Sequence, residues 1–289
     1  MIPGQFVYHR PSSVAEAVGL LASLGEEARP LAGGHSLIPM MKLRMASPEH
    51  LVDLGGLADL KGVREEAGSI VIGATTTQAE LIKSDLLANR LPIIRETALL
   101  IADPQIRTKG TIGGNVANGD PGNDMPGVMQ CLAADYVLTS PAGERVVAAR
   151  DFYQGAYFTA LEAGELLTAL RVPVPPAGHG FAYEKLKRKV GDYATAAAAV
   201  ILTMNGGTVA TCSIALTNVA PTPLFAEAAS RLVVGTSLDA ATVKAAAEAA
   251  KAIADPATDG RGTAEYRREM AGVMVARALA KAESRAKGT

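Results

Sequence analysis

Two glycine-rich turns in the N-terminal half of the sequence constrain the fold more than any other feature. The first is Ala32-Gly33-Gly34-His35-Ser36 and the second is Thr111-Ile112-Gly113-Gly114-Asn115, and each follows an apolar or β-prone stretch. Adjacent glycines expose a run of backbone N–H groups without Cβ atoms in the way, so a phosphate group can approach closely. Two turns of matching composition indicate a ligand with two phosphates, one for each turn. A dinucleotide such as FAD meets that requirement.

Neither turn has the spacing of the better-known nucleotide motifs. The GxGxxG arrangement of βαβ nucleotide folds is absent, and no lysine follows the last glycine as it does in a P-loop. NAD on a Rossmann domain and ATP on a P-loop are therefore disfavoured. Taken alone, the first turn fits an ordinary strand-to-helix turn with Ser36 near the cap. We expect His35 to contribute its backbone N–H rather than to act as a base.

The global composition is typical of a soluble enzyme or enzyme subunit. The 289 residues are enough for two domains, and 48% of them are hydrophobic. The 28 basic and 29 acidic residues leave a net charge of −1, so nucleic acid is not an expected partner. No apolar run reaches the roughly 18 residues that span a bilayer, and the N-terminus lacks a secretion signal. We therefore expect a cytoplasmic protein.

Metal-binding and nucleophile motifs are not evident in this sequence. Cys131 and Cys212 are its only cysteines, and we interpret both as small apolar core residues. An iron–sulfur cluster normally needs four cysteine thiolates, so this chain alone does not hold one. The four histidines show no metal-ligand spacing, and no Ser/His/Asp arrangement stands out. Any catalysis would therefore depend on a bound cofactor.

The first part of the chain has a βαβ pattern followed by a second unit of mixed structure. Ser13 and Glu16 have capping-box spacing, and apolar residues then recur at helical intervals up to Gly25. We predict strands at 6–8, 51–54, 62–63, 69–73, 136–139, 145–147 and 166–174. We predict further helices at 36–45, 77–87, 91–101 and 125–133. The segment 120–126 is too rich in proline, glycine, asparagine and aspartate for regular structure.

Three prolines and two glycines between Pro173 and Gly180 mark the best candidate for a domain boundary. We place an N-terminal domain at 1–176, with subdomains at about 1–55 and 56–176, and a C-terminal domain at 177–289.

The C-terminal domain combines strands and helices. The alanines of 197–204 favour a helix by propensity, but Asn205-Gly206 is a strong hairpin signal. We therefore predict strands at 197–204 and 211–219, after a β-prone segment at 181–188. The remainder is predicted to be helical.

Acidic and amide side chains follow the second turn at Asn118, Asp120 and Asp124. A carboxylate close behind a phosphate-binding loop is suited to accept hydrogen bonds from ribose or ribityl hydroxyls. The alternative is that these residues are helix caps and turn formers. We favour that alternative for Asp120, whereas for Asp124 both interpretations remain open.

A basic run from Tyr183 to Lys189 precedes Gly191-Asp192-Tyr193. Its alternating charge is typical of a solvated strand face, which we favour. The functional alternative is that Lys185 or Lys187 faces a ligand phosphate or an acidic neighbouring subunit. An aromatic residue after a glycine turn can stack on a planar heterocycle, although a tyrosine in a core or at a rim is commoner.

Together these motifs resemble the FAD-binding subunits of the molybdenum hydroxylases, the xanthine dehydrogenase group, over essentially the whole chain. Within that group the likeness is greatest to the medium subunits of aerobic carbon monoxide dehydrogenases. The opening Met-Ile-Pro-Gly and the segments 102–107, 118–124, 185–189 and 191–193 carry this likeness. The paired glycine motifs are specific to the family, whereas the choice of carbon monoxide rests on overall similarity.

The resemblance implies an α+β fold. It consists of a vanillyl-alcohol-oxidase-type FAD-binding domain of two α/β subdomains and a C-terminal domain with a three-stranded antiparallel sheet and a helical bundle. The turn residues would hold the pyrophosphate, Asp124 would bind sugar or ribityl hydroxyls, and Ile101 would pack against the flavin region. Tyr193 would lie near the isoalloxazine. Lys185 is a weaker candidate for an FAD-binding residue. The full set is Ala32, Gly33, Gly34, His35, Ser36, Ile101, Thr111, Ile112, Gly113, Gly114, Asn115, Asp124, Lys185 and Tyr193.

The resemblance also implies partners. A large subunit would oxidise CO with water at a molybdenum–copper cofactor, and a small subunit would pass the electrons through two [2Fe–2S] clusters. The FAD of this chain would collect them and reduce a quinone-type acceptor, within a dimer of heterotrimers. Peripheral contact with the inner face of the cytoplasmic membrane is compatible with a quinone acceptor.

Three alternatives remain beside this interpretation. The nearest is the flavin subunit of a molybdenum hydroxylase that acts on an aromatic or N-heterocyclic substrate. A flavin-free scaffold subunit is disfavoured because the glycine pairs and Asp124 are intact. A self-contained flavin oxidase would need its own substrate base, and none is evident.

Overall fold

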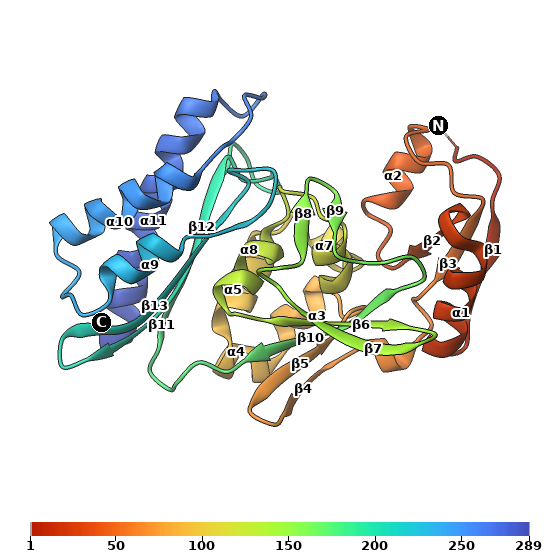
Figure 1. Ribbon diagram of the computed structural model, residues 1–289, viewed down its shortest axis with the longest axis horizontal. Coiled ribbons are helices and arrows are strands. Elements are labelled where there is room, and N and C mark those ends of the chain that lie inside the picture. Colours follow the sequence, from red (N-terminus) through yellow and green to blue (C-terminus); the bar gives the residue numbers. More distant parts are fainter. Residues whose placement is uncertain (1, 289) are drawn as a thin grey trace.

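The computed structural model describes residues 2–288 of the chain. Three larger β-sheets follow one another along the molecule, with helices between and around them (Figure 1). Within the described residues these sheets contain three, five and four strands, and a two-stranded hairpin lies beside the central one. The mixed helix and sheet content agrees with the expected class.

The N-terminal sheet is parallel, with the strand order β1-β3-β2. Its strands are β1 (Val7–His9), β2 (Ala28–Leu31) and β3 (His50–Asp53). Helix α1 (Val14–Leu24) connects β1 to β2, and its apolar face shares a small core with Val52 of β3. The Ser13 side chain accepts a hydrogen bond from the N–H of Glu16 at 3.1 Å, so the predicted helix start is confirmed.

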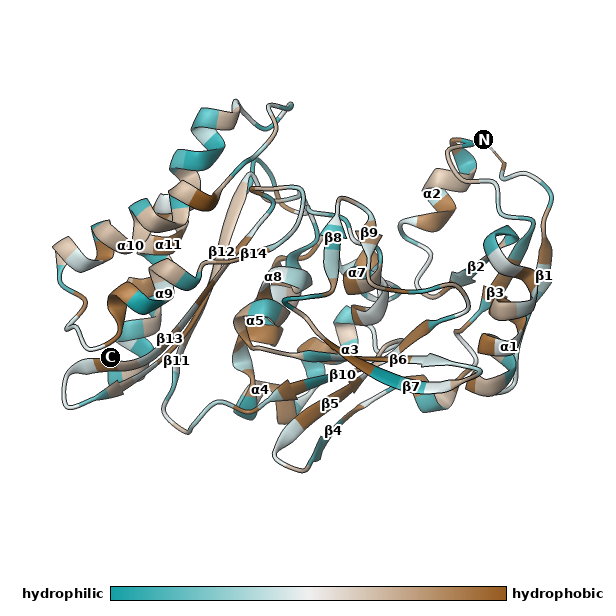
Figure 2. Cartoon of the chain, in the orientation of Figure 1, coloured by the Kyte–Doolittle hydropathy of each residue, from teal (hydrophilic) through white to brown (hydrophobic). Residues whose placement is uncertain are grey.

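The central sheet is antiparallel, with the strand order β4-β5-β10-β6-β7. These strands are β4 (Val63–Glu66), β5 (Ser69–Gly73), β6 (Asp135–Ser140), β7 (Gly143–Ala148) and β10 (Leu166–Pro173). The small hairpin is formed by β8 (Tyr153–Gly155) and β9 (Phe158–Thr159). Figure 2 shows β5 and β10 largely in brown, because both contribute to the main core.

The helices of the first domain are shorter than predicted. They are α2 (Leu37–Lys42), α3 (Gln78–Lys83), α4 (Asp85–Arg90), α5 (Pro92–Leu100), α6 (Pro104–Arg107), α7 (Ile112–Ala117) and α8 (Asp124–Cys131). The helix predicted at 77–87 is broken at Ser84, whose side chain accepts from the N–H of Leu87 and so caps a new helix. Regular structure also starts earlier than expected, because Asp124 to Pro126 form the first turn of α8.

The C-terminal sheet has the strand order β11-β12-β13-β14 and is antiparallel. Its strands are β11 (Gly180–Leu186), β12 (Ala196–Asn205), β13 (Thr208–Thr217) and β14 (Leu224–Phe225). The expected count of three strands was one too few, because the two residues of β14 pair with the edge of β13. The helices α9 (Glu227–Val233), α10 (Ala240–Ile253) and α11 (Ala264–Lys287) cover one face of this sheet (Figure 1).

Strand β12 is buried on both faces. Ala198 and Val200 belong to the core beneath the helices α10 and α11, whereas Ala197 and Ala199 belong to the main core, which includes residues of the central sheet. Alternation of polar and apolar residues is therefore missing, and small alanine side chains let both layers approach closely. The strand predicted for this segment is confirmed.

A charged cluster also connects the two parts of the chain. Glu96 of α5 accepts hydrogen bonds from the backbone N–H of Tyr183 at 2.8 Å and from Arg285 of α11 at 2.6 Å. Lys281 of α11 lies 3.4 Å from the same carboxylate and 2.9 Å from Glu184. These contacts hold β11 against α5, and β11 carries one of the predicted site residues.

In the described part of the chain, no helix combines the length and hydropathy that a membrane span requires.

Candidate functional site

The two glycine-rich turns meet at one place in the structure. A Cβ atom built on Gly33 would lie 2.3 Å from the carbonyl oxygen of Lys109 and 2.9 Å from Cα of Gly110. Gly34 has a φ of +74°, and a Cβ there would lie 2.6 Å from Cδ1 of Ile38. Glycine is therefore required at 33 by the contact between the two segments and at 34 by the backbone conformation.

The first turn keeps its donors available. No acceptor among residues 2–288 takes a hydrogen bond from the backbone N–H groups of Gly33, Gly34, His35 or Ser36. All of these residues line one cavity. Unpaired N–H groups that converge at a cavity wall are suited to bind an anionic group such as a phosphate.

The second turn does not offer unpaired N–H groups to a phosphate as predicted, because its N–H groups already donate within the chain. Gly113 donates to the carbonyl oxygen of Ala74 at 2.8 Å, and Gly114 donates to the Thr111 hydroxyl at 3.1 Å. Ile112 and Asn115 donate to other backbone oxygens. The physical reason is that this segment folds as the capped first turn of α7.

The second turn still shapes the cavity wall. A Cβ on Gly113 would lie 2.5 Å from Ala74, so this glycine is required for packing. Gly114 is exposed at the cavity, where a Cβ would meet only the Thr111 hydroxyl, at 2.9 Å. The carboxamide oxygen of Asn115 accepts from the N–H of Met125 at 3.2 Å. Gly114 is thus the position in this turn at which a side chain would occupy ligand space.

Asp124 lies in a buried cluster of charged and polar groups. Its carboxylate accepts hydrogen bonds from the hydroxyl of Tyr183 at 2.6 Å and from Nζ of Lys185 at 2.8 Å. Burial raises the pKa of the Asp124 carboxyl, and the neighbouring Lys185 ammonium opposes that rise. Each carboxylate oxygen retains capacity for a further donor. The cluster can therefore still accept a hydrogen bond from a ligand hydroxyl.

The basic run is not a solvated strand face at Lys185, so the favoured interpretation was wrong there. The Lys185 side chain is only 1% exposed, and Nζ also donates to the carbonyl oxygen of Leu100 at 3.3 Å. Lys187 is half-buried, which lowers the pKa of its amine. Local charge alternation predicted exposure, but the tertiary partner Asp124 is 61 residues away in the chain.

Tyr193 lies at the cavity and is 42% exposed. Its hydroxyl donates to Asp120 at 3.3 Å, and burial together with this carboxylate raises the pKa of the phenol. Asp120 also accepts from the N–H of Gly122 at 2.9 Å, which confirms its predicted role as a turn former. Tyr157 lies beside the same carboxylate, which raises the pKa of its phenol after the larger effect of burial. Tyr157 cannot be recognised in the sequence as a site residue, because no motif surrounds it.

The cavity has a volume of about 680 Å³, and its lining residues come from the N-terminal part of the chain, from the segments around the central sheet and from residues 185–193. This volume is in the usual range for small-molecule and cofactor sites. Every predicted site residue lines the cavity except Ile112, whose side chain is fully buried in the main core. Further lining residues that the sequence did not indicate include Gln78, Thr75 and Tyr157.

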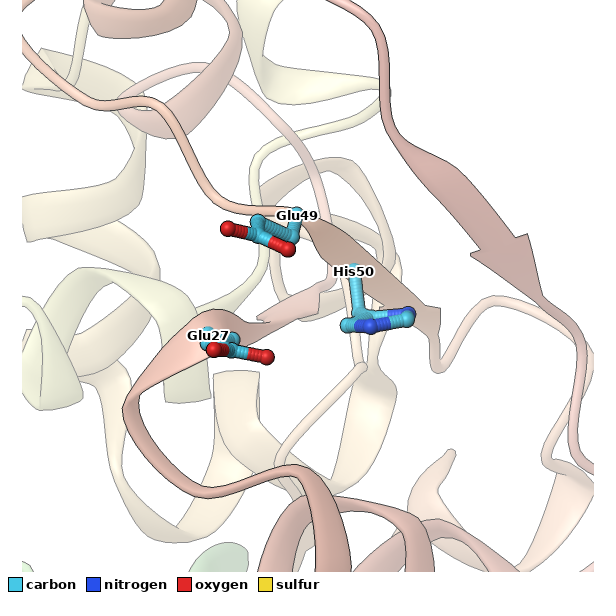
Figure 3. A group of neighbouring side chains, drawn as sticks. All are labelled: Glu27, Glu49 and His50. Carbon is cyan, nitrogen blue, oxygen red and sulfur yellow. The ribbon is translucent and has the colours of Figure 1, made fainter.

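A separate group of potential metal ligands lies outside the cavity. Figure 3 shows Glu27, Glu49 and His50, whose ligand atoms all lie within 4.8 Å of one another. A ring nitrogen of His50 also lies 3.0 Å from a ring nitrogen of His9. Both glutamates are exposed, and exposed carboxylates commonly gather without an ion. None of the three lines the cavity described above.

Comparison with known proteins identifies the class. The family model described as the FAD-binding domain in molybdopterin dehydrogenase matches residues 4–175. The model described as the CO dehydrogenase flavoprotein C-terminal domain matches residues 181–282. The chain therefore belongs to the family of flavoprotein subunits of molybdopterin dehydrogenases.

Individual relatives show which members of the family this chain is similar to. The carbon monoxide dehydrogenase medium chain of Afipia carboxidovorans is 69% identical over 99% of this chain and 100% of its own length. A solved chain of a Cu,Mo-CO dehydrogenase, in its cyanide-inactivated form, is also 69% identical, with a TM-score of 0.98 over 99% and 100% of the two chains. A chain of quinoline 2-oxidoreductase from Pseudomonas putida 86 is 34% identical, with a TM-score of 0.94 over 99% of each chain.

Proposed function

We propose that this chain is the FAD-carrying electron-transfer subunit of an aerobic carbon monoxide dehydrogenase. The observation that carries the proposal is the pair of glycine turns meeting at one cavity, in a chain 69% identical to a carbon monoxide dehydrogenase medium chain. The complex would convert CO and water to CO₂, two protons and two electrons. The oxidation itself would take place on another subunit.

The residues of the cavity fit FAD. Gly33, Gly34, His35 and Ser36 offer unpaired N–H groups of the kind that a diphosphate requires. Gly114 leaves space that any Cβ atom would fill, and Asp124 retains acceptor capacity for ribityl or sugar hydroxyls. We assign Ile101, Lys185 and Tyr193 to the flavin end of the site. Bound FAD would supply a group that accepts single electrons and passes on a pair.

The remaining predicted residues support this arrangement in different ways. Ala32 precedes the unpaired donors and lines the cavity. Thr111 caps α7 and so fixes Gly113, Gly114 and Asn115 at the wall. We propose that Ile112 acts through core packing, since its side chain is fully buried.

The partners follow from the same proposal. The relatives named medium chain or medium subunit indicate multisubunit enzymes. We propose a small subunit with [2Fe–2S] clusters and a large subunit with a molybdenum–copper cofactor, assembled as a dimer of heterotrimers. Two cysteines in this chain are too few for a cluster, which supports this division. A quinone would accept the electrons, in the cytoplasm at the inner face of the membrane.

We also propose the domain division given above. The family models end at 175 and begin again at 181, which supports domains at 1–176 and 177–289. The parallel N-terminal sheet and the antiparallel central sheet flank the cavity, which supports two subdomains of the vanillyl-alcohol-oxidase type.

Flavin content tests the proposal. The complex that co-purifies with the full chain is denatured, and the released flavin is identified by chromatography. We expect one FAD for each copy of this chain. Its absence would favour the flavin-free scaffold alternative. A hydroxylase acting on an aromatic heterocycle is the alternative that keeps FAD, and identities of 69% against 34% favour carbon monoxide.

A further inference from the structure

Gln78 is buried with its whole carboxamide unpaired. The residue is only 2% exposed, yet neither Nε2 nor Oε1 has a hydrogen-bond partner among the described residues. Several side chains in residues 2–288 have a buried unpaired atom. Among them, Gln78 is the one that has both its donor and its acceptor unpaired and also lines the cavity. Gln130 is 3% exposed and has only its Oε1 unpaired, because its Nε2 donates to the carbonyl oxygen of Ala149 at 3.4 Å.

The position of Gln78 places it where the two glycine turns meet. Its backbone N–H donates to the carbonyl oxygen of Gly110 at 2.9 Å, and Gly110 is the residue against which Gly33 packs. The preceding residue, Thr77, forms an isolated β-bridge with Thr111 at the start of the second turn. The side chain therefore starts from the backbone that joins both turns.

An unpaired buried carboxamide is costly, since each unsatisfied polar group loses its hydrogen bonds with water without replacement. Such groups in native proteins need a specific explanation. A ligand that supplies both an acceptor and a donor at this wall would remove the cost. The first turn indicates what that ligand offers, because its unpaired N–H groups call for an anionic acceptor.

We propose that Gln78 is a binding residue for the dinucleotide, with Nε2 donating to the diphosphate and Oε1 accepting from a neighbouring ligand hydroxyl. This inference rests on the proposed FAD-binding function and adds a side-chain donor that neither glycine turn contains. Gln78 opens α3, where Thr77 caps the helix by accepting from the N–H of Glu80. The capping box fixes the position from which the carboxamide reaches the cavity.

Titration of the deflavinated full chain with FAD tests the proposal. Gln78→Met removes both polar atoms while keeping the length of the side chain. Loss of a hydrogen bond to a charged group is expected to raise the Kd for FAD about 10- to 100-fold. The same substitution should raise the Tm of the deflavinated chain by about 2 °C, because an unpaired buried group is removed.

Gln130→Met is the matched control. It removes a buried carboxamide whose nitrogen is hydrogen-bonded, whose oxygen is unpaired, and which does not line the cavity. We expect an unchanged Kd for FAD. A Kd that rises in Gln78→Met but not in Gln130→Met would separate ligand binding from general packing.

Two fragments assign the contact within the ligand. Competition with ADP probes the diphosphate, and competition with riboflavin probes the part without phosphates. Gln78→Met should weaken the binding of ADP more than the binding of riboflavin, and the reverse pattern would overturn the assignment. Gln78→Glu keeps the shape of the side chain but should weaken FAD binding, because the carboxylate repels the diphosphate. Its affinity for FAD should recover as the pH falls and the carboxyl is protonated.

Equal FAD affinities for wild type, Gln78→Met and Gln78→Glu would overturn the inference while leaving the proposed function intact. Failure of the wild-type chain to bind FAD would overturn both. If Gln78→Met does not fold, the pH dependence of FAD binding by Gln78→Glu still tests whether Gln78 contacts the ligand.

Discussion

Replacing Lys185 with methionine tests whether the cluster around Asp124 is a true buried ion pair. The Nζ and carboxylate atoms lie 2.8 Å apart, and the two side chains are 1% and 6% exposed. At an effective dielectric constant of about 20, this distance corresponds to an attraction of about 6 kcal/mol. Burial of the two charges offsets much of that energy, so the pair itself adds little net stability.

Breaking the pair has a larger effect than its net contribution. Without Lys185 the Asp124 carboxylate would keep only the Tyr183 hydroxyl as a side-chain hydrogen-bond partner, and the Lys187 ammonium would act on it through electrostatic attraction alone. We expect Lys185→Met to lower the free energy of unfolding by about 3–5 kcal/mol, as in other buried pairs that lose one partner. Urea unfolding of the full chain without FAD, followed by circular dichroism, measures this value.

The double variant Asp124→Asn/Lys185→Met provides the control, because it removes both charges together. It should be more stable than Lys185→Met alone, since no uncompensated charge remains. A cost below about 1 kcal/mol for the single variant would refute the reasoning. A double variant no more stable than the single one would refute it as well.

Further predictions concern the turns, the aromatic residue and the domain contact. Gly114→Val should abolish FAD retention while the fold persists. Gly33→Val should also reduce solubility, because its Cβ would meet the Lys109 backbone. Flavin absorbance measures the loss of FAD, and circular dichroism measures whether the fold persists. Tyr193→Ala should change the flavin absorbance or reduction potential more than the Tm, and an unchanged spectrum and potential would remove Tyr193 from the site. Burial raises the pKa of Glu96, but the hydrogen bonds from Arg285 and Tyr183 outweigh it, so the net pKa is lowered. The contribution of Glu96 to stability is therefore fully present above the ordinary carboxyl pKa, and it is lost as the pH falls through the lowered pKa of the folded state. Glu96→Gln should make Tm fall less steeply between about pH 5 and pH 3 than it does in the wild type. Curves of Tm against pH that run parallel for the two proteins would contradict this.

Local patterns in the sequence predicted much of the fold. The cap at Ser13 and the hairpin at Asn205-Gly206 each depend on neighbouring residues, so they can be recognised without tertiary information. The break at Ser84 was missed because apolar residues continue across it, and only the serine cap separates the two helices. Strand β14 was missed because two residues are too few for a periodic pattern.

The site was harder to predict where distant segments cooperate. The glycine pairs indicated the cavity, since their chemistry is local. The burial of Lys185 depends on Asp124, and the contact between Gly33 and Gly110 joins segments that lie far apart in the sequence. Gln78 follows an ordinary capping threonine, and nothing in the sequence distinguishes it from a surface residue on a helix. Such residues become visible only when their unpaired atoms are placed against a cavity.

An absorbance spectrum of the co-purified complex, recorded anaerobically before and after CO is added, tests the central claim most directly. We expect flavin bands that bleach with CO, since electrons from CO would reach the FAD of this chain. Flavin bands that stay oxidised with CO but bleach with a purine or aromatic substrate would replace the proposed substrate. A complex without flavin bands would contradict the assignment of this chain as the FAD-carrying subunit.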